Sequence, residues 1–282
     1  MDRDIEIGGK ERDRSKEPTL DRSRADDRER RIHDIARDGR RVYSVSPDER
    51  QTMVDIGRFR IVDTEDLAGF RYLGKEGQMC QDLKALTAQG LIQTKTVWTG
   101  RDREVMTYAA LTKAGKRLLI RQQTVPTGQE IYSGFVKPAE LRHDAGIYPM
   151  FRREASRIEQ EGGRIKRVVL DYELKKKAYS PLAKARTLSR EEYIKRHAEI
   201  AREHGLKIVN GHITLPDLRI EYEDSRGVSG QIDLEVASES YHGSHAAEKA
   251  AAGFKIYASP DTAERLSRAL EEREITAEIF SL

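Results

Sequence analysis

Hydrophobic and polar residues follow two repeating patterns in this chain, and the helical pattern begins near residue 46. The stretch SPDE at 46–49 predicts a helix start, because serine caps the first turn, proline suits its first position and glutamate completes a capping box. Three helical segments follow, and their apolar stripes include Met53, Leu67 and Met79. Two alternating segments within 91–111 then predict a β-hairpin, and a fourth helix comes after it.

Helix, helix, helix, hairpin and helix is the element order of a winged helix-turn-helix, which we expect over residues 46–123. In that fold the third helix enters the major groove of DNA, and the hairpin tip lies on the backbone. The candidate DNA-binding residues are Lys75, Gln78, Gln81, Arg101 and Arg103. Asp82 is expected to be exposed beside them, and Trp98, just before the hairpin turn, is expected to pack against the domain.

A weak charge leaves a second interpretation of this segment open. Over 46–140 the chain has 14 Lys and Arg against 12 Asp and Glu, a net charge of only +2. Winged helices also serve as protein-interaction or dimerisation modules, and that use needs no basic surface. The sequence therefore predicts double-stranded DNA as the partner, with protein interaction as the alternative.

The second half of the chain alternates between helical and strand patterns, which predicts an α/β domain over 141–282. Residues 124–140, rich in proline and glycine, are interpreted as a linker, and 178–205 as an insertion in the second domain that is helical in its second half. The other predicted strands lie at 165–174, 207–213, 217–223, 230–237 and 275–279, and the other predicted helices at 141–161, 244–257 and 259–272. The fold class is therefore α+β, with a central mixed sheet in the second domain.

Composition sets the remaining limits. Residues 1–45 are dense in charge and poor in large apolar side chains, so we interpret them as a disordered tail with at most a helix near 26–37. No apolar run is long enough to span a bilayer, and the N-terminus lacks the apolar core of a signal peptide. With Cys80 as its single cysteine, the chain has neither a disulfide framework nor a cysteine zinc site. We expect a cytoplasmic protein with no membrane partner.

Charge is unevenly distributed in the second domain. Lys and Arg outnumber Asp and Glu by 16 to 10 over 141–205, whereas 206–282 has 8 against 14. A basic face beside a carboxylate cluster is the combination that holds nucleic-acid phosphate and a metal ion. Charge also fluctuates along any hydrophilic chain, so this pattern alone does not decide the function.

Three carboxylates in the acidic segment have the spacing of a metal-dependent nuclease. Asp217 follows a proline at the start of one predicted strand, and Asp233 and Glu235 lie on one side of the next. In the PD-(D/E)xK nuclease-like fold, which this pattern resembles, carboxylates on two neighbouring strands bind Mg²⁺ and a lysine supports the chemistry. Ala237 stands where that lysine is expected, and Lys255 or Lys249 is the candidate replacement.

Further short motifs, placed in order after the predicted winged helix, resemble the replication-relaxation family of plasmids and other mobile elements. The matching residues are His143, Asp144, Asp217, Glu235, Lys255 and Tyr257. This chain departs from the family where Val236 and Ala237 follow Glu235. The resemblance implies a winged helix joined to a nuclease-like domain, with work on DNA in replication, copy number or mobilisation.

The resulting expectation is a double-stranded DNA-binding protein acting in replication control, mobilisation or transcription regulation. Its nuclease-like domain is expected to act without turnover, so binding needs no cofactor. One alternative is a Mg²⁺-dependent endonuclease or nickase that uses Asp217, Asp233 and Glu235 as ligands and Lys255 in catalysis. Another is a scaffold that assembles replication or mobilisation proteins, and a homodimer is compatible with each of these interpretations.

Overall fold

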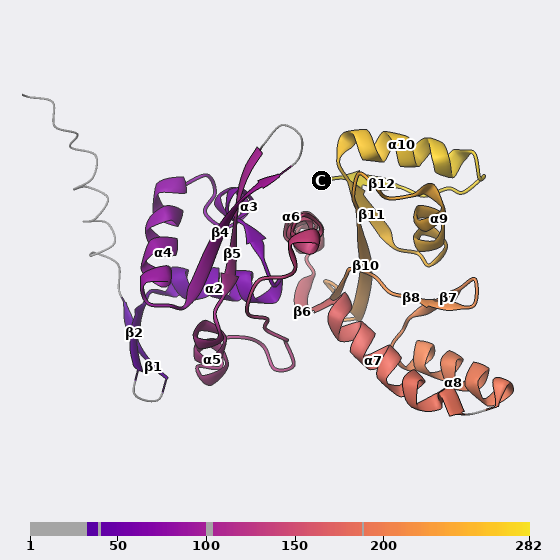
Figure 1. Cartoon of the computed structure of the whole chain (residues 1–282), viewed down its shortest axis with the longest axis horizontal. Coiled ribbons are helices and arrows are strands. Elements are labelled where there is room, and N and C mark those ends of the chain that lie inside the picture. The colour runs from indigo at the N-terminus through magenta and orange to yellow at the C-terminus, as the bar shows by residue number, and fades with distance from the viewer. Residues whose placement is uncertain (1–32, 39–40, 100–103, 188) are drawn as a thin grey trace, which may run out of the picture.

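The computed structural model describes residues 33–38, 41–99, 104–187 and 189–282, arranged in two lobes with the long helix α6 between them (Figure 1). We call residues 33–121 the N-terminal lobe and residues 141–282 the C-terminal lobe. Helices and strands are mixed in both, which confirms the α+β class. Within the described part of the chain, no helix combines the length and the apolar character needed to cross a membrane.

The N-terminal lobe contains a small antiparallel sheet and four helices. Ser46 caps the first helix with both bonds of the predicted capping box. The elements are α2 (Pro47–Arg58), β3 (Val62–Asp63), α3 (Thr64–Phe70), α4 (Glu76–Ala88), β4 (Ile92–Thr99), β5 (Glu104–Leu111) and α5 (Lys113–Arg121). The three strands pair in the order β3-β5-β4. The predicted hairpin and the four predicted helices are therefore present.

A hairpin of β1 (Asp34–Asp38) and β2 (Arg41–Val45) precedes this set, where a disordered tail was expected. Its apolar positions Ala36, Tyr43 and Val45 are buried in the main core, so the segment contributes to folding despite its charge. The prediction of disorder, and of a helix reaching residue 37, is wrong for the described part of 33–45. Residues 1–32 lie outside the described residues.

The C-terminal lobe is organised around a five-stranded mixed sheet with the order β12-β11-β10-β9-β6. Its elements are α6 (Leu141–Gln160), β6 (Arg164–Leu170), α7 (Asp171–Lys184), α8 (Arg190–Glu203), β7 (Lys207–Val209), β8 (His212–Thr214), β9 (Leu218–Glu223), β10 (Ser229–Ala237), α9 (Gly243–Ala251), β11 (Lys255–Ala258), α10 (Pro260–Glu271) and β12 (Ile279–Ser281). Strands β6, β9 and β10 are antiparallel neighbours, whereas β11 and β12 continue in parallel from β10. Helix α6 covers one face of the sheet, and α9 and α10 pack on the other.

Several predicted elements in this lobe have wrong bounds. The strand expected at 207–213 is instead the hairpin of β7 and β8, and the first part of the insertion expected at 178–205 continues the helix α7. The strand expected at 165–174 ends at Leu170, and α7 begins at Asp171 with acidic residues in its first turn, where they favour a helix. The helix expected at 244–257 ends at Ala251 and is followed by the strand β11, because Gly253 adopts a φ of +84° that turns the chain back. The last strand runs from Ile279 to Ser281 rather than over 275–279.

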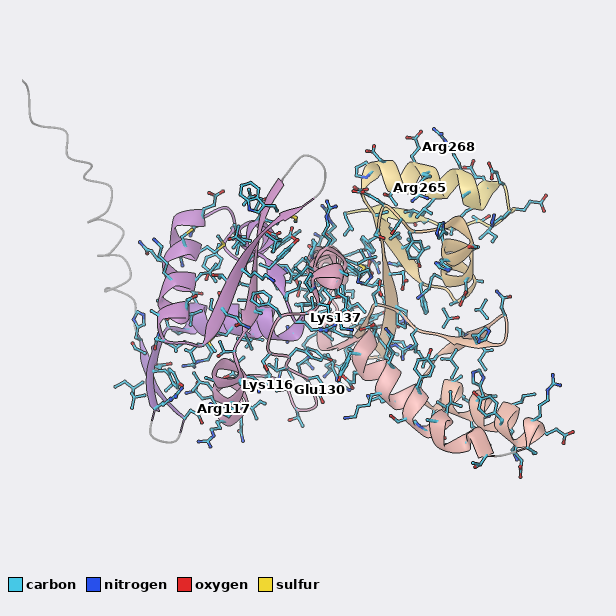
Figure 2. All side chains as sticks on the ribbon, in the orientation of Figure 1. Lys116, Arg117, Glu130, Lys137, Arg265 and Arg268 are labelled. Atoms are coloured by element: carbon cyan, nitrogen blue, oxygen red, sulfur yellow. The ribbon has the colours of Figure 1, made fainter. Side chains whose placement is uncertain are left out.

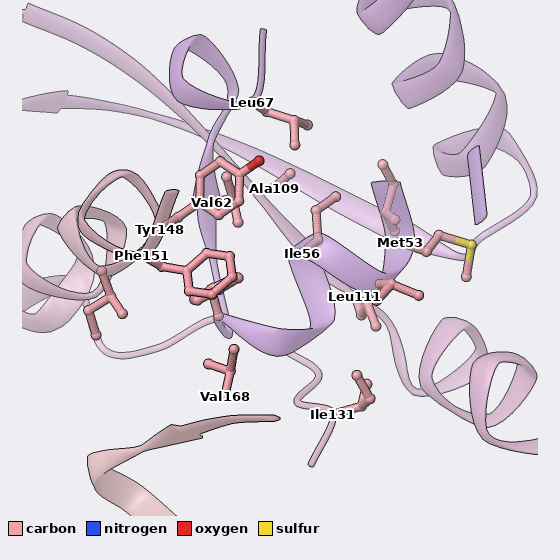
Figure 3. Close-up of a cluster of buried hydrophobic side chains, with 14 of the residues drawn as sticks. Met53, Ile56, Val62, Leu67, Ala109, Leu111, Ile131, Tyr148, Phe151 and Val168 are labelled. Atoms are coloured by element: carbon pink, nitrogen blue, oxygen red, sulfur yellow. The ribbon is translucent and has the colours of Figure 1, made fainter. Parts of the chain in front are cut away.

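One continuous hydrophobic core joins the two lobes through α6 (Figure 3). Phe59 of the N-terminal lobe packs against Tyr148 and Phe151 of α6, with ring centroids 5.3 and 4.9 Å apart. Residues 124–140, interpreted as a linker, also pack against the N-terminal lobe, since Ile131 is buried and Tyr132 N donates to Gly57 O at 2.7 Å. Figure 2 shows side chains filling the region around α6.

Candidate functional site

Helix α4 presents the candidate base-reading residues with unequal exposure. Lys75 lies exposed at its N-cap, whereas Gln78 and Gln81 are half-buried. Asp82 is fully buried and accepts a hydrogen bond from the Tyr72 hydroxyl at 3.0 Å, so its expected exposure is wrong. The exposed side chains along the helix and its N-cap are Lys75, Glu76, Cys80, Lys84, Thr87 and Ala88.

The β4–β5 hairpin carries an exposed apolar pair. Trp98 is 72% exposed, so the expected packing role is wrong, and Val105 faces it across the two strands. Both lie one register pair from the turn end of the hairpin. Arg101 and Arg103 lie outside the described residues.

Glu235 is the centre of a buried polar cluster beneath α9. Its carboxylate accepts a hydrogen bond from the Tyr241 hydroxyl at 2.8 Å and from the Lys249 ammonium at 2.9 Å. Lys249 also donates to Leu215 O at 2.6 Å, so this ammonium is held by two partners. Burial and the nearby negative charge of Asp217 raise the pKa of Glu235 to about 7, against the opposing effect of Lys249.

Asp217 reaches this cluster from the chain just before β9. One of its oxygens accepts from Val236 N at 2.9 Å and from His143 Nε2 at 3.1 Å. The other ring nitrogen of His143 lies 3.4 Å from Asp144, and hydrogen bonds to Asp144 and Asp217 raise the pKa of His143 to about 10. His143 is therefore an imidazolium at neutral pH and donates to both carboxylates.

Asp144 extends this chain of charges into the N-terminal lobe. Its carboxylate forms an ion pair with Arg60 at 2.9 Å, and Arg60 follows α2 with a φ of +67°, in the left-handed region. The two residues that the family resemblance placed at the head of a helix, His143 and Asp144, thus connect Asp217 to the lobe boundary. Sequence reasoning missed Arg60 and Tyr241, because neither stands in a recognisable motif.

Asp233 does not join this cluster. Arg219, opposite it on β9, holds its carboxylate with bonds of 2.6 and 2.8 Å and also donates to Gly205 O at 3.1 Å. Arg219 is itself buried, so the pair fastens the sheet to the end of α8. The structure brings together Asp217 and Glu235 of the predicted trio, and the use of Asp233 as a third ligand is not supported.

Lys255 lies on the opposite face of the sheet from Glu235. Lys255 is paired in register with Leu234 of β10, whereas Glu235 is paired with Ile256, so the two side chains point to opposite faces. The Lys255 ammonium donates to Glu154 of α6 at 2.9 Å. Tyr257 donates to the same carboxylate at 2.8 Å. The prediction of Lys255 as the catalytic lysine is therefore wrong. Lys249, the other candidate, is the lysine beside the carboxylates.

A cavity of about 270 Å³ opens beside Asp217 and Lys249, between α7 and α9. Its wall includes Asp171, Lys175 and Tyr179 at the start and middle of α7. The Lys175 ammonium donates a hydrogen bond to the Asp171 carboxylate at 2.5 Å. Across the described residues, no three or more His, Cys, Asp or Glu side chains are grouped to hold a metal ion.

No family model, curated protein or solved structure matches this chain. The resemblance to the replication-relaxation family stays a prediction. The function is therefore argued from the geometry of the chain itself.

Proposed function

We propose that this protein binds double-stranded DNA through α4 and the β4–β5 hairpin. The observation that carries the proposal is the strand order β3-β5-β4, combined with the sequence of elements α2, β3, α3, α4, β4 and β5. This order resembles that of a winged helix-turn-helix, in which the third helix and the hairpin form the DNA-binding surface.

The orientation of α4 supports this assignment. Met79, Leu83 and Leu86 are buried on its inner side, which fixes the helix against the core. Lys75 and Lys84 lie exposed on the same helix, where an ammonium can contact phosphate. Binding of this kind depends on phosphate contacts and weakens steeply with salt.

We propose that the C-terminal lobe is a PD-(D/E)xK-like scaffold that takes part in this binding without turnover. After α6 come the three antiparallel strands β6, β9 and β10, then the helix α9 and the parallel strand β11. A further segment is inserted between β6 and β9. Asp217 lies directly before β9 and Glu235 lies on the neighbouring strand β10, and protein donors already occupy oxygens of both carboxylates. In this proposal the protein serves replication control, mobilisation or transcription regulation in a mobile element.

One observation favours a second function, a Mg²⁺-dependent endonuclease or nickase. The Lys249 ammonium lies 2.9 Å from Glu235, so α9 supplies the lysine that β10 lacks. Asp217 and Glu235 fit such a metal, because Mg²⁺ is commonly held by one or two carboxylates together with water and substrate phosphate. When bound, the metal would supply an activated water and neutralise charge on the phosphate. Lys249 would favour the ionised form of Glu235 and hold its carboxylate in place.

The DNA-binding proposal is tested by fluorescence anisotropy with a blunt duplex at several salt concentrations. Replacing Lys75 and Lys84 with alanine should weaken binding and reduce the slope of log K against log salt by about 2. Lys113→Ala with Lys116→Ala removes the same charge from α5 (Figure 2) and serves as the matched control. Equal effects of the two double variants would remove α4 from the binding surface.

The two proposals for the C-terminal lobe are separated by a plasmid-nicking assay with Mg²⁺ or Mn²⁺. Nicking that Asp217→Asn and Lys249→Met both abolish would establish the endonuclease. Intact plasmid under conditions where the wild-type protein binds the duplex would support a lobe without turnover.

A further inference from the structure

Helix α7 has an outward face on which two lysines lie between two tyrosines. Tyr172 and Tyr179 are 60% and 48% exposed, and Lys175 and Lys176 lie exposed between them. At 100° per residue these four positions fall within a quarter to a third of the helix circumference. The two tyrosines are seven residues apart, which places them about 10 Å apart along the helix axis.

This face is not needed to fold the helix. Leu174, Ala178 and Leu182 are buried on the inner side of α7, in the apolar cluster of the inserted segment. The two tyrosines are left in contact with solvent, although burial of an aromatic ring normally stabilises a fold. Lys176 has no ion-pair partner among the residues that the structure describes.

The face connects the lobe boundary to the carboxylate cluster. At one end the Tyr172 ring packs edge-on against Tyr132, and the Arg60 guanidinium lies 5.9 Å from the centre of the Tyr172 ring. Along its side, Asp171, Lys175 and Tyr179 line the cavity that also contains Asp217 and Lys249. A ligand lying along α7 would therefore enter that cavity.

We infer that this face of α7 binds an unpaired DNA strand and directs it toward the cavity. Bases would stack on the exposed rings of Tyr172 and Tyr179, and the Lys176 ammonium would contact the backbone. Aromatic platforms with interleaved cations are how proteins hold single strands without reading sequence. Protein-binding surfaces are depleted in lysine, whereas here two exposed lysines stand between the two rings. The inference rests on the proposed function, because the duplex bound by α4 supplies the strand.

Binding to three DNAs tests the inference: a blunt duplex, the same duplex with a single-stranded thymidine tail, and the tail alone. We expect wild-type protein to bind the tailed duplex more tightly than the blunt one, and to bind the tail alone. Lys176→Ala with Tyr179→Ala should weaken binding of both tail-containing DNAs by about fivefold or more, since the loss of one stacked base has at least that effect in many proteins. Binding of the blunt duplex should not change.

The matched control is Lys195→Ala with Ile194→Ala, which removes one exposed lysine and one exposed large apolar side chain from α8. Circular dichroism establishes that both double variants are folded. Equal affinity of the wild-type protein for blunt and tailed duplex, or an equal effect of the two double variants, would overturn the inference. Failure of the proposed function appears separately, as blunt-duplex binding that the Lys75 and Lys84 variant does not alter.

Discussion

The carboxylate of Glu154 is the buried anchor between α6 and β11, and replacing it with glutamine should destabilise the protein by about 3 kcal/mol. The side chain of Glu154 is 0% exposed and accepts hydrogen bonds from Arg157, Lys255 and Tyr257. Breaking a buried ion pair by removing one partner costs about 3–5 kcal/mol. The side chains of Arg157 and Lys255 are 41% and 28% exposed, so they regain water and the lower end applies.

The chain contains a matched control for this change. Glu161 also pairs with Arg157, at 2.6 Å, but its side chain is 63% exposed. Glu161→Gln should therefore cost less than about 0.5 kcal/mol. Urea unfolding followed by far-ultraviolet circular dichroism measures both variants, because Trp98 is too exposed to report on the core by fluorescence.

The pH dependence provides a second readout. Hydrogen bonds from Arg157, Lys255 and Tyr257 lower the pKa of Glu154, despite its burial. A lowered pKa in the folded state gives stability that is present above the ordinary value of about 4.5 and is lost as pH falls through the folded value. The difference between wild type and Glu154→Gln should thus shrink in acid. Equal costs for Glu154→Gln and Glu161→Gln at neutral pH would refute the burial argument.

Three other changes have defined outcomes. Gly115→Ala should cost about 2 kcal/mol or more in thermal unfolding, because its new carbon would lie 2.1 Å from Leu91 O, whereas Gly69→Ala meets nothing within 4 Å and should be neutral or stabilising. The wild type should lose up to about 3 kcal/mol of stability as the pH rises from 4.5 to 7, because the raised pKa of Glu235 favours the folded state only while the carboxyl is protonated. Glu235→Gln should not show this loss, and urea unfolding at about pH 5 and about pH 8 measures both proteins. His143→Gln should destabilise at pH 6 but much less above pH 10, because the raised pKa of His143 stabilises the fold below about 6.5 and this is lost through about 10; the folded pKa itself is measurable by NMR titration.

Local patterns predicted most of the elements of the N-terminal lobe. The capping box at Ser46, the apolar stripe of Met79 and the alternating hairpin strands are each encoded within a few residues, so the sequence alone reveals them. The hairpin at 34–45 was missed because its charge density resembles that of a disordered segment. Its few apolar residues, such as Tyr43, become informative only once a core is present to bury them.

The candidate site depended on contacts that no local pattern contains. Spacing placed Asp217, Asp233 and Glu235 near one another, but Arg219 on the neighbouring strand removes Asp233 from the group. The choice between Lys249 and Lys255 depended on where α9 ends. A helix through residue 257 leaves both lysines available, whereas the turn at Gly253 moves Lys255 to the other face of the sheet.

The shared core around α6 limits how this gene can be divided or recombined. A fragment that ends at residue 140 would leave Phe59 without Tyr148 and Phe151, and a fragment that starts after α6 would uncover the sheet at Val236, beside Gly146. Either half would present a large apolar surface to solvent and would aggregate. Exchange of one lobe between related genes therefore preserves folding only where α6 and the residues of both lobes that contact it are inherited together.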